Sequence, residues 1–343
     1  GLPEKFQILD SDDQLRLIKR INKSLSLDES NWPSRQCQWF INKQKDEGLR
    51  AANLEDFGED FMKTMIQIYG AYEEACDRGG MVDFGELLLR SHDLWLKNPV
   101  LLEHYQQRFR YILVDEFQDT NAAQYRLVKI LTKKHQNVCV VGDDDQSIYR
   151  WRGANIENIF NFEKDFPGTK LIKLEENYRS TKTILKAAGE LVKENLHRKP
   201  KTLWTQNETG ELIQYIRSED ETDEAQTVCD IIKRINEEEG ISLTNVAILY
   251  RTNAQSRAVE DVLRRFRLPY QVVGGLKFYE RKEIKDVLAY LRLVINPDDS
   301  VSLKRIINVP ARGIGKTSLE KIDAWSVQKG IPFLEGLRSV ERE

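Results

Sequence analysis

Two adjacent carboxylates, Asp115 and Glu116, directly follow an apolar run from Tyr111 to Val114. The run does not alternate with polar residues, which predicts a β-strand buried on both faces. Carboxylates at the carboxyl end of such a strand lie where open α/β sheets bind their ligands. Magnesium prefers oxygen ligands, and a water that attacks a phosphate needs a base nearby. Asp115 therefore suits magnesium and Glu116 suits the water, while the alternative is a solvated acidic turn.

A second polar segment follows the next apolar run and reads Gly142-Asp-Asp-Asp-Gln-Ser-Ile-Tyr-Arg-Trp-Arg-Gly-Ala154. Three consecutive aspartates repel one another unless a cation or a basic partner is near. Gln146 is neutral and can both donate and accept hydrogen bonds, which suits contact with a γ-phosphate or its attacking water.

The end of the same segment alternates aromatic rings with guanidinium groups. Tyr149 and Trp151 stand beside Arg150 and Arg152. Rings between cations form a platform for unpaired bases, and stacking there contributes roughly 1–3 kcal/mol per base. The alternative is that Trp151 belongs to the core. Arginines on both sides make full burial unfavourable, so we favour base stacking.

Other charged residues have two open interpretations each. Arg179, in Leu174-Glu-Glu-Asn-Tyr-Arg-Ser180, could act as an arginine finger, with Tyr178 stacked on a base, but from this segment alone an ordinary turn before a helix, with a surface arginine, is favoured. The basic loop His197-Arg-Lys-Pro-Lys201 is either a contact to a phosphate backbone or a solvated connector. Three basic residues earlier in the chain could also contact a phosphate backbone, but a position on a solvated helix face is favoured for them: Lys43, Lys45 and Arg50.

The elements that would position these residues form an α/β pattern. Residues 1–109 have helical periodicity, for example over 12–24, 61–76 and 82–96. From residue 110, apolar runs alternate with amphipathic helices, which predicts βαβ units of a parallel sheet in two successive domains. The expected strands are 111–114, 137–141, 170–174, 211–216 and 246–250. The expected helices between and after them are 121–134, 155–166, 181–195, 223–238, 254–266 and 282–294.

The segment Gly313-Ile-Gly-Lys-Thr317 contains Gly-Lys-Thr, the sequence that ends a phosphate-binding loop. That motif needs a glycine five residues before the glycine of its Gly-Lys pair, where this chain has Pro310. A tight turn between two helices explains the segment better. No other G-x-x-x-x-G-K-[ST] pattern occurs in the printed sequence.

Composition limits the remaining possibilities. The 343 residues carry 52 basic and 55 acidic side chains, so any nucleic-acid site must be a local groove. Four separated cysteines imply neither zinc nor disulfides and fit a reducing, cytoplasmic compartment. No apolar run approaches the roughly 20 residues that span a bilayer, so no membrane association is expected.

Five segments together resemble the superfamily 1 DNA helicases of the UvrD/PcrA/Rep type, and most closely the UvrD/PcrA branch. They are Asp115–Thr120, Val141–Ala154, Glu176–Ser180, Tyr250-Arg-Thr-Asn-Ala-Gln-Ser256 and Gly274–Asp286. The resemblance implies that Asp115 binds Mg²⁺, that Glu116 polarises the attacking water, and that Gln146 and Arg179 contact the γ-phosphate of ATP. It implies adenine stacking on Tyr178. It also implies contacts to single-stranded DNA from Tyr149, Trp151, Arg152 and Asn253.

The family organisation implies parts of two RecA-like motor domains with helical insertions. Residues 1–109 would be the first insertion, 110–175 the rest of the first motor domain, 176–272 the first part of the second, and 273–343 the start of the second insertion. The phosphate-binding loop is expected upstream and the late motifs downstream. We therefore expect the central part of an ATP-dependent 3′–5′ helicase of repair or replication, nucleoid-associated, acting at single/double-strand junctions with repair-protein partners.

Two other functions remain open. The first is a helicase subunit of a RecBCD/AddAB-like nuclease, although no segment suggests a nuclease domain. The second is a non-catalytic DNA- or partner-binding module. For the 343-residue polypeptide alone we expect weak ATP binding and no unwinding of DNA.

Overall fold

The computed structural model describes residues 2–4, 6–196, 198–273 and 282–339. The chain divides into two compact units, which we describe separately. The first comprises Gly1–Asn177, Ala188–Trp204 and Ala289–Glu343, and the second comprises Tyr178–Ala187 and Thr205–Leu288. In the described part of the chain, no helix is both long and apolar enough to cross a bilayer.

The first unit begins with a helical region packed around α3 (Asp60–Arg78), as the periodicity predicts. Met65, Ile68 and Tyr72 of α3 are buried against apolar side chains of two neighbouring helices. Those neighbours are α1 (Ser11–Ser24) and α2 (Ser34–Asp46), and the region continues through α4 (Phe84–Lys97) and α5 (Pro99–Arg108). Two short parallel strands, β1 (Gln7–Ile8) and β2 (Met81–Val82), join the start of the chain to the end of α3.

A parallel pair of strands carries the two polar segments of interest. β3 (Ile112–Val114) pairs with β4 (Val138–Val140), in register at Ile112 and Val138. One face is covered by aromatic side chains that follow β3 or belong to α6 (Ala122–Thr132) and α7 (Glu157–Asp165), including Phe117 and Tyr125. The predicted α/β pattern with parallel strands is therefore confirmed.

The prediction that the first strand is buried on both faces is wrong. The side chain of Leu113, which points away from the aromatic cluster, is 78% exposed. In the described residues, helices α6 and α7 contribute apolar contacts to one face of the β3–β4 pair. The opposite face therefore keeps its apolar side chains in contact with solvent.

Three further predicted strands, 170–174, 211–216 and 246–250, do not form. A strand is defined by hydrogen bonds to a neighbour, and the described chain supplies no neighbouring strand for these three segments; the one isolated bridge, between Glu176 and Trp204, lies outside them. Their apolar periodicity is real, but without a partner strand the backbone stays irregular.

The second unit is built on α9 (Glu221–Glu238) and α10 (Ser256–Phe266). Ala225 and Cys229 of α9 are buried against Val262 and Leu263 of α10. The helix α8 (Lys182–Val192) begins in this unit and ends in the first. All four cysteines of the chain are free thiols.

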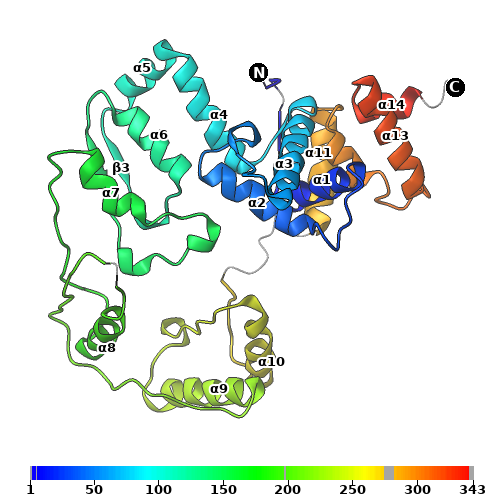
Figure 1. Ribbon diagram of the computed structural model, residues 1–343. Coiled ribbons are helices and arrows are strands. Elements are labelled where there is room, and N and C mark those ends of the chain that lie inside the picture. Colours follow the sequence, from blue (N-terminus) through cyan, green and yellow to red (C-terminus); the bar gives the residue numbers. More distant parts are fainter. Residues whose placement is uncertain (1, 5, 197, 274–281, 340–343) are drawn as a thin grey trace. The chain divides into compact units, whose positions relative to one another are not determined.

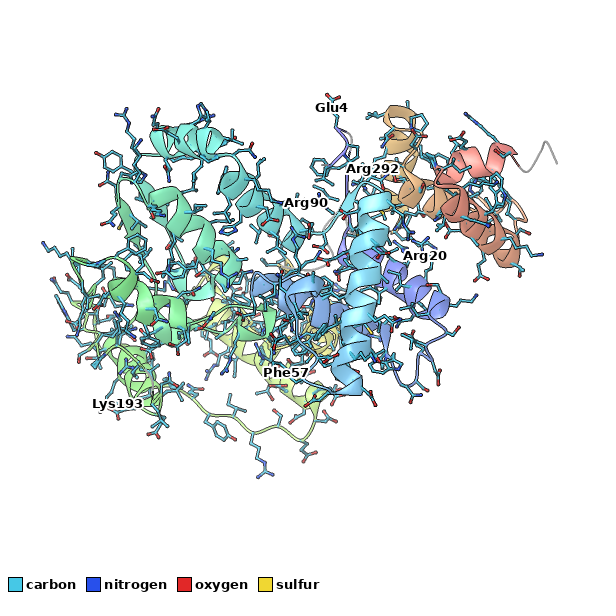
Figure 2. The ribbon with its side chains drawn as sticks, turned by 45° about the horizontal axis from the view of Figure 1, so that its top comes forward. Glu4, Arg20, Phe57, Arg90, Lys193 and Arg292 are labelled. Atoms are coloured by element: carbon cyan, nitrogen blue, oxygen red, sulfur yellow. The ribbon has the colours of Figure 1, made fainter. Side chains whose placement is uncertain are left out.

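Four helices end the chain: α11 (Lys282–Ile295), α12 (Ser300–Ile306), α13 (Lys316–Lys329) and α14 (Phe333–Ser339). Residues 313–315 lie in the connection between α12 and α13, as predicted, whereas Lys316 and Thr317 already belong to α13, whose N-cap is Gly315. Arg20, labelled in Figure 2, pairs with Asp323 of α13 at 3.1 Å. Residues 274–281, which begin the last of the five family segments, lie outside the described residues.

Candidate functional site

Asp115 and Glu116 are exposed at the carboxyl end of β3, where the sequence places them. The Asp115 carboxylate accepts a hydrogen bond from the backbone N–H of Glu116 at 2.9 Å. Glu116 adopts a left-handed backbone conformation, with φ 49° and ψ 44°. That conformation is unfavourable for a residue with a Cβ, and such strain concentrates at functional sites. The turn therefore aims two carboxylates away from the strand end.

Gln118 connects this turn to the segment after β4. Its side chain is 1% exposed, its amide donates to Glu116 Oε2 at 2.7 Å, and its Oε1 accepts from the backbone N–H of Asp143 at 3.0 Å. The sequence gives no sign of this role beyond a polar residue next to the two carboxylates. Because Gln118 itself is buried and bonded to both segments, it links the ends of β3 and β4.

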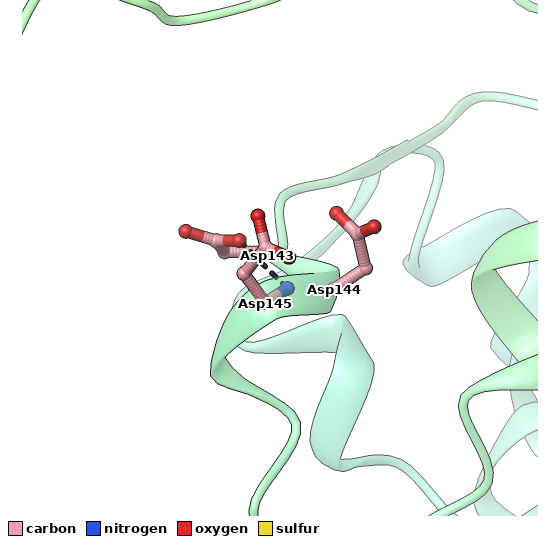
Figure 3. A group of neighbouring side chains, drawn as sticks. All are labelled: Asp143, Asp144 and Asp145. Atoms are coloured by element: carbon pink, nitrogen blue, oxygen red, sulfur yellow. Dashed lines mark hydrogen bonds between the residues drawn. The ribbon is translucent and has the colours of Figure 1, made fainter. Parts of the chain in front are cut away.

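The second polar segment forms a short 3-10 helix, η3 (Asp144–Gln146), with Asp143 as its N-cap, and Figure 3 shows the three carboxylates of Asp143, Asp144 and Asp145. The Gln146 side chain is exposed and donates to Asp143 Oδ2 at 2.9 Å. The basic partner that three adjacent aspartates require comes from the loop at residues 198–201. Both earlier interpretations of that loop, a phosphate contact or a solvated connector, miss these ion pairs with carboxylates.

The aromatic segment continues into η4 (Arg150–Arg152). The Trp151 side chain is 61% exposed, so the alternative that it belongs to the core is wrong. The Arg152 guanidinium lies over the Trp151 ring at 4.6 Å and over the Tyr149 ring at 5.1 Å, measured to the ring centroids. This arrangement holds two aromatic rings and a cation together at the surface, as a stacking platform requires.

Hydrogen bonds connect the acidic turn to this platform. The backbone N–H of Asn155 and the side-chain amide of Asn158 donate to the carbonyl of Thr120, at 2.9 and 3.0 Å. Asn121 donates to Asp46 of α2 at 2.7 Å. An added Cβ at Gly153 would lie 2.2 Å from Asp46 Oδ2, so only glycine fits there. Sequence reasoning missed these contacts because they join residues far apart in the chain.

Of the three cations in the helical region, Lys43 is exposed, as the favoured interpretation of a solvated helix face predicts, whereas Lys45 and Arg50 are held in ion pairs. Lys45 is 2% exposed and pairs with Asp83 at 2.7 Å and with Glu86 at 3.1 Å. Burial alone would lower the pKa of Lys45, but these carboxylates raise it above its usual value. Arg50 pairs with Glu86 at 2.7 Å. Lys45 is therefore buried, and the guanidinium of the partly exposed Arg50 is already paired with carboxylates.

Tyr178, Arg179 and Asn253 belong to the second unit. The Tyr178 ring is 79% exposed, and the carbonyl of Tyr178 accepts from Asn207 Nδ2 at 3.4 Å. Asn253 opens η6 (Asn253–Gln255), and its carbonyl accepts from Ser256 Oγ at 2.9 Å. The roles expected for them, adenine stacking by Tyr178, a γ-phosphate contact by Arg179 and a DNA contact by Asn253, stay predictions.

The acidic turn suits a magnesium ion. Mg²⁺ binds proteins through one or two carboxylates and keeps waters and phosphate oxygens as its other ligands. Asp115 offers an exposed carboxylate at the carboxyl end of a parallel strand, with one oxygen turned to a backbone N–H. Asp143–Asp145, by contrast, are engaged by protein cations.

Comparison with protein families matches nearly the whole chain. Residues 1–167 match the UvrD/REP helicase N-terminal domain, and residues 172–337 match the UvrD-like helicase C-terminal domain. The two matched ranges contain the acidic turn, the platform and the second unit.

Characterised relatives agree with these matches. The chain is 49% identical over 343 residues to DNA helicase II of Escherichia coli (strain K12), covering 100% of this chain and 48% of that protein. It is 48% identical over 342 residues to the ATP-dependent DNA helicase PcrA of Bacillus subtilis (strain 168), covering 99% of this chain and 46% of that protein. The chain thus spans about half the length of the curated relatives it matches. With both domains matched in order, the chain belongs to the UvrD/Rep family of superfamily 1 DNA helicases.

Proposed function

We propose that the chain is the central part of an ATP-dependent 3′–5′ DNA helicase or translocase that unwinds duplex DNA in repair or replication. One observation carries the proposal: Gln118 joins Glu116 to the loop of Gln146, and that loop leads into the exposed Trp151 platform. The proposed site of ATP hydrolysis and the proposed base-stacking surface are therefore connected through the same loop. The cytoplasm, close to the nucleoid, is the proposed location.

The proposed roles at the nucleotide follow the chemistry of each side chain. Bound Mg²⁺ would neutralise charge on the phosphates of ATP. Asp115 binds the metal, Glu116 polarises the attacking water, and Gln146 responds to the γ-phosphate. Arg179 supplies a cation for the charge that develops on the phosphate, and Tyr178 stacks on adenine. The amide of Gln118 fixes the Glu116 carboxylate at 2.7 Å, which supports its use as an oriented base.

The proposed DNA contacts are Tyr149, Trp151 and Arg152, with Asn253 from the second unit. Stacking on Trp151 needs no particular base, which suits a motor that moves along any sequence. The proposed substrates are single-stranded DNA and single/double-strand junctions, together with repair-protein partners.

The proposed organisation assigns 1–109 to a helical insertion and 110–175 to the first motor domain. Residues 176–272 belong to the second motor domain, and 273–343 to the start of its insertion. The printed sequence contains no G-x-x-x-x-G-K-[ST] pattern. Without the backbone N–H groups of such a loop, the 343-residue polypeptide should bind ATP weakly and not unwind DNA.

The test compares the 343-residue polypeptide with the full-length protein in two assays. We expect the full-length protein to hydrolyse ATP faster with single-stranded DNA and to unwind a duplex with a 3′ tail but not one with a 5′ tail. The polypeptide alone should do neither. If the full-length protein binds DNA but does not hydrolyse ATP, the helicase proposal is wrong and the hypothesis of a non-catalytic binding module remains.

A further inference from the structure

The aspartate run after β4 has the form of a cation site. Oxygens of Asp143, Asp144 and Asp145 lie within 4.8 Å of one another. Figure 3 also shows the backbone N–H of Asp145 donating to Asp143 Oδ1, at 3.0 Å. Three negative charges this close repel one another and require compensation.

The compensating cation is a side chain of this chain. The ammonium of Lys201 contacts all three carboxylates: Asp143 Oδ1, Asp144 Oδ1 at 3.1 Å and Asp145 Oδ2 at 3.1 Å. It occupies the position between the carboxylates that a metal ion would need. Lys201 is only 17% exposed, so water competes little with these contacts.

The remaining carboxylate oxygens also have protein donors. Arg198 makes a two-pronged contact with Asp145, at 3.1 Å from Nε and 2.7 Å from a terminal nitrogen. The backbone N–H of Lys199 donates to Asp144 Oδ2 at 2.7 Å, and Gln146 donates to Asp143 Oδ2 at 2.9 Å. All six oxygens are therefore used within the protein, which leaves no ligand set for a divalent metal.

The strength of these contacts is visible at Asp145. Burial raises the pKa of its carboxyl, yet hydrogen bonds from Arg198, Lys201 and Asn195 outweigh that effect and bring the pKa to about 2. The carboxylate thus stays charged and paired at any pH at which the protein would work. We call this set of contacts, from Arg198, Lys199 and Lys201 to Asp143–Asp145, the clasp.

The clasp acts on the loop that carries Gln146. Asp143 accepts from Lys201 and from Gln146, and its own backbone N–H donates to Gln118, which holds Glu116. A shift of Asp143 would therefore move both side chains proposed to work at the γ-phosphate. Along the chain, the basic segment lies between Ala187 and Thr205, residues of the second unit.

We propose that Lys201 and Arg198 are positioning residues, which fix Gln146 and Glu116 for hydrolysis through the clasp and bind neither DNA nor metal. The inference rests on the proposed function, since it names residues that serve the same hydrolytic site. Their effect should fall on the rate of hydrolysis, because the proposed contacts to ATP and DNA come from other side chains.

The test uses Lys201→Gln and Arg198→Gln in the full-length protein. We expect each to lower the kcat of DNA-stimulated ATP hydrolysis about tenfold or more, since small misplacement of reacting groups is costly. The KM for ATP and the affinity for single-stranded DNA should stay unchanged. Lys201→Arg, which keeps the charge, should retain most of the activity, and the double variant Arg198→Asp/Asp145→Arg should recover part of what Arg198→Asp loses.

Lys199→Gln is the matched control, because its ammonium pairs with Glu163 and only its backbone enters the clasp. It should behave like the unmodified protein. Weakened DNA binding with unchanged kcat in Lys201→Gln would assign the basic loop to DNA and overturn the proposal. Manganese bound by Asp143–Asp145, and lost in Asp144→Asn, would overturn it as well.

Amide hydrogen exchange in the same full-length variants measures how firmly the clasp holds the loop at 143–146, independently of enzymatic activity. The backbone N–H groups of 143–146 should exchange about tenfold faster in Lys201→Gln, while those of α3 are unchanged. Unchanged exchange at 143–146 would refute the clasp. An unmodified protein with the expected exchange pattern but no ATP hydrolysis would instead refute the proposed function.

Discussion

The buried amide of Gln118 lies 2.7 Å from Glu116 Oε2 and gives that carboxylate one fixed orientation. Space around Gln118 is limited, because a Cβ added to Gly142 would lie 2.8 Å from its Oε1. Gly142 and Gln118 therefore fit together, and Glu116 is held relative to the loop that carries Gln146. This pair therefore links Glu116, the proposed water-polarising group, to the loop of the proposed γ-phosphate contact.

Glu116→Gln should abolish ATP hydrolysis in the full-length protein while ATP still binds. The substitution keeps the size of the side chain and removes the group that takes a proton, which contributes typically about 10²–10⁴-fold in rate. Steady-state hydrolysis and nucleotide-binding titrations measure the two effects. Glu157→Gln, at an exposed position of α7, is the control and should change neither. Normal turnover in the Glu116→Gln protein would remove that residue from the chemistry.

Trp151→Ala should weaken the response to single-stranded DNA more than basal hydrolysis. Loss of one stacked base is worth roughly 1–3 kcal/mol, or about 5- to 150-fold in DNA affinity. The DNA concentration that half-maximally stimulates hydrolysis measures the effect. Trp151→Phe should keep much of the affinity because a ring remains. Phe57→Ala, at a side chain 83% exposed and labelled in Figure 2, serves as the control. Unchanged stimulation in Trp151→Ala would contradict the stacking role.

The helices could be predicted from sequence because their signals are local. The apolar stripe over 12–24 corresponds to α1, and Asp10, directly before this helix, accepts a hydrogen bond from the backbone N–H of Asp13 as its N-cap. Strands depend on neighbours that may be distant in sequence. The segment 111–114 finds β4 as a partner, whereas 170–174, which is also rich in apolar residues, has no partner strand among the described residues.

The residues of the candidate site also fall into two groups: those with a local sequence signal and those whose role depends on a distant contact. Asp115, Glu116 and Trp151 stand out because their types and order are unusual in a local stretch. Gln118 and Arg198 do not, since their roles depend on one specific contact: Arg198 meets Asp145 across 53 positions of the chain. No periodicity or composition encodes such a pairing, and only the folded backbone brings the two side chains together.

Lys45→Ala should strongly destabilise the helical region. The substitution leaves Asp83 buried without its cation, whereas Glu86 keeps its pairs with Arg50 and Arg90, and breaking a buried pair in this way costs about 3–5 kcal/mol. Denaturant unfolding followed by circular dichroism measures the loss. Lys43→Ala is the matched control, because Lys43 lies on the same helix, is exposed and contacts the Trp39 ring at 5.2 Å. Equal stability of the two variants would show that the Lys45 pair contributes nothing net.

Asp46 should make the stability of the first unit depend on pH. Burial raises the pKa of its carboxyl from 3.8 to about 6, and the hydrogen bond from Asn121 offsets only part of that rise. The unfolded chain would lose this proton near its ordinary pKa. Between about pH 6 and pH 4 the folded state therefore binds more protons than the unfolded state, so stability rises as the pH falls through this range.

Asp46→Asn removes that dependence, because an amide cannot ionise but can still accept the hydrogen bond from Asn121 at its oxygen. The variant should be more stable than the unmodified chain at pH 7–8, by up to about 1.4 kcal/mol per unit of pKa difference, and the gap should close towards pH 4. Unfolding midpoints across this pH range test it, with the exposed Asp60→Asn as control. A variant that is less stable by the same amount at every pH would show that the Asp46 charge is stabilising, contrary to its burial.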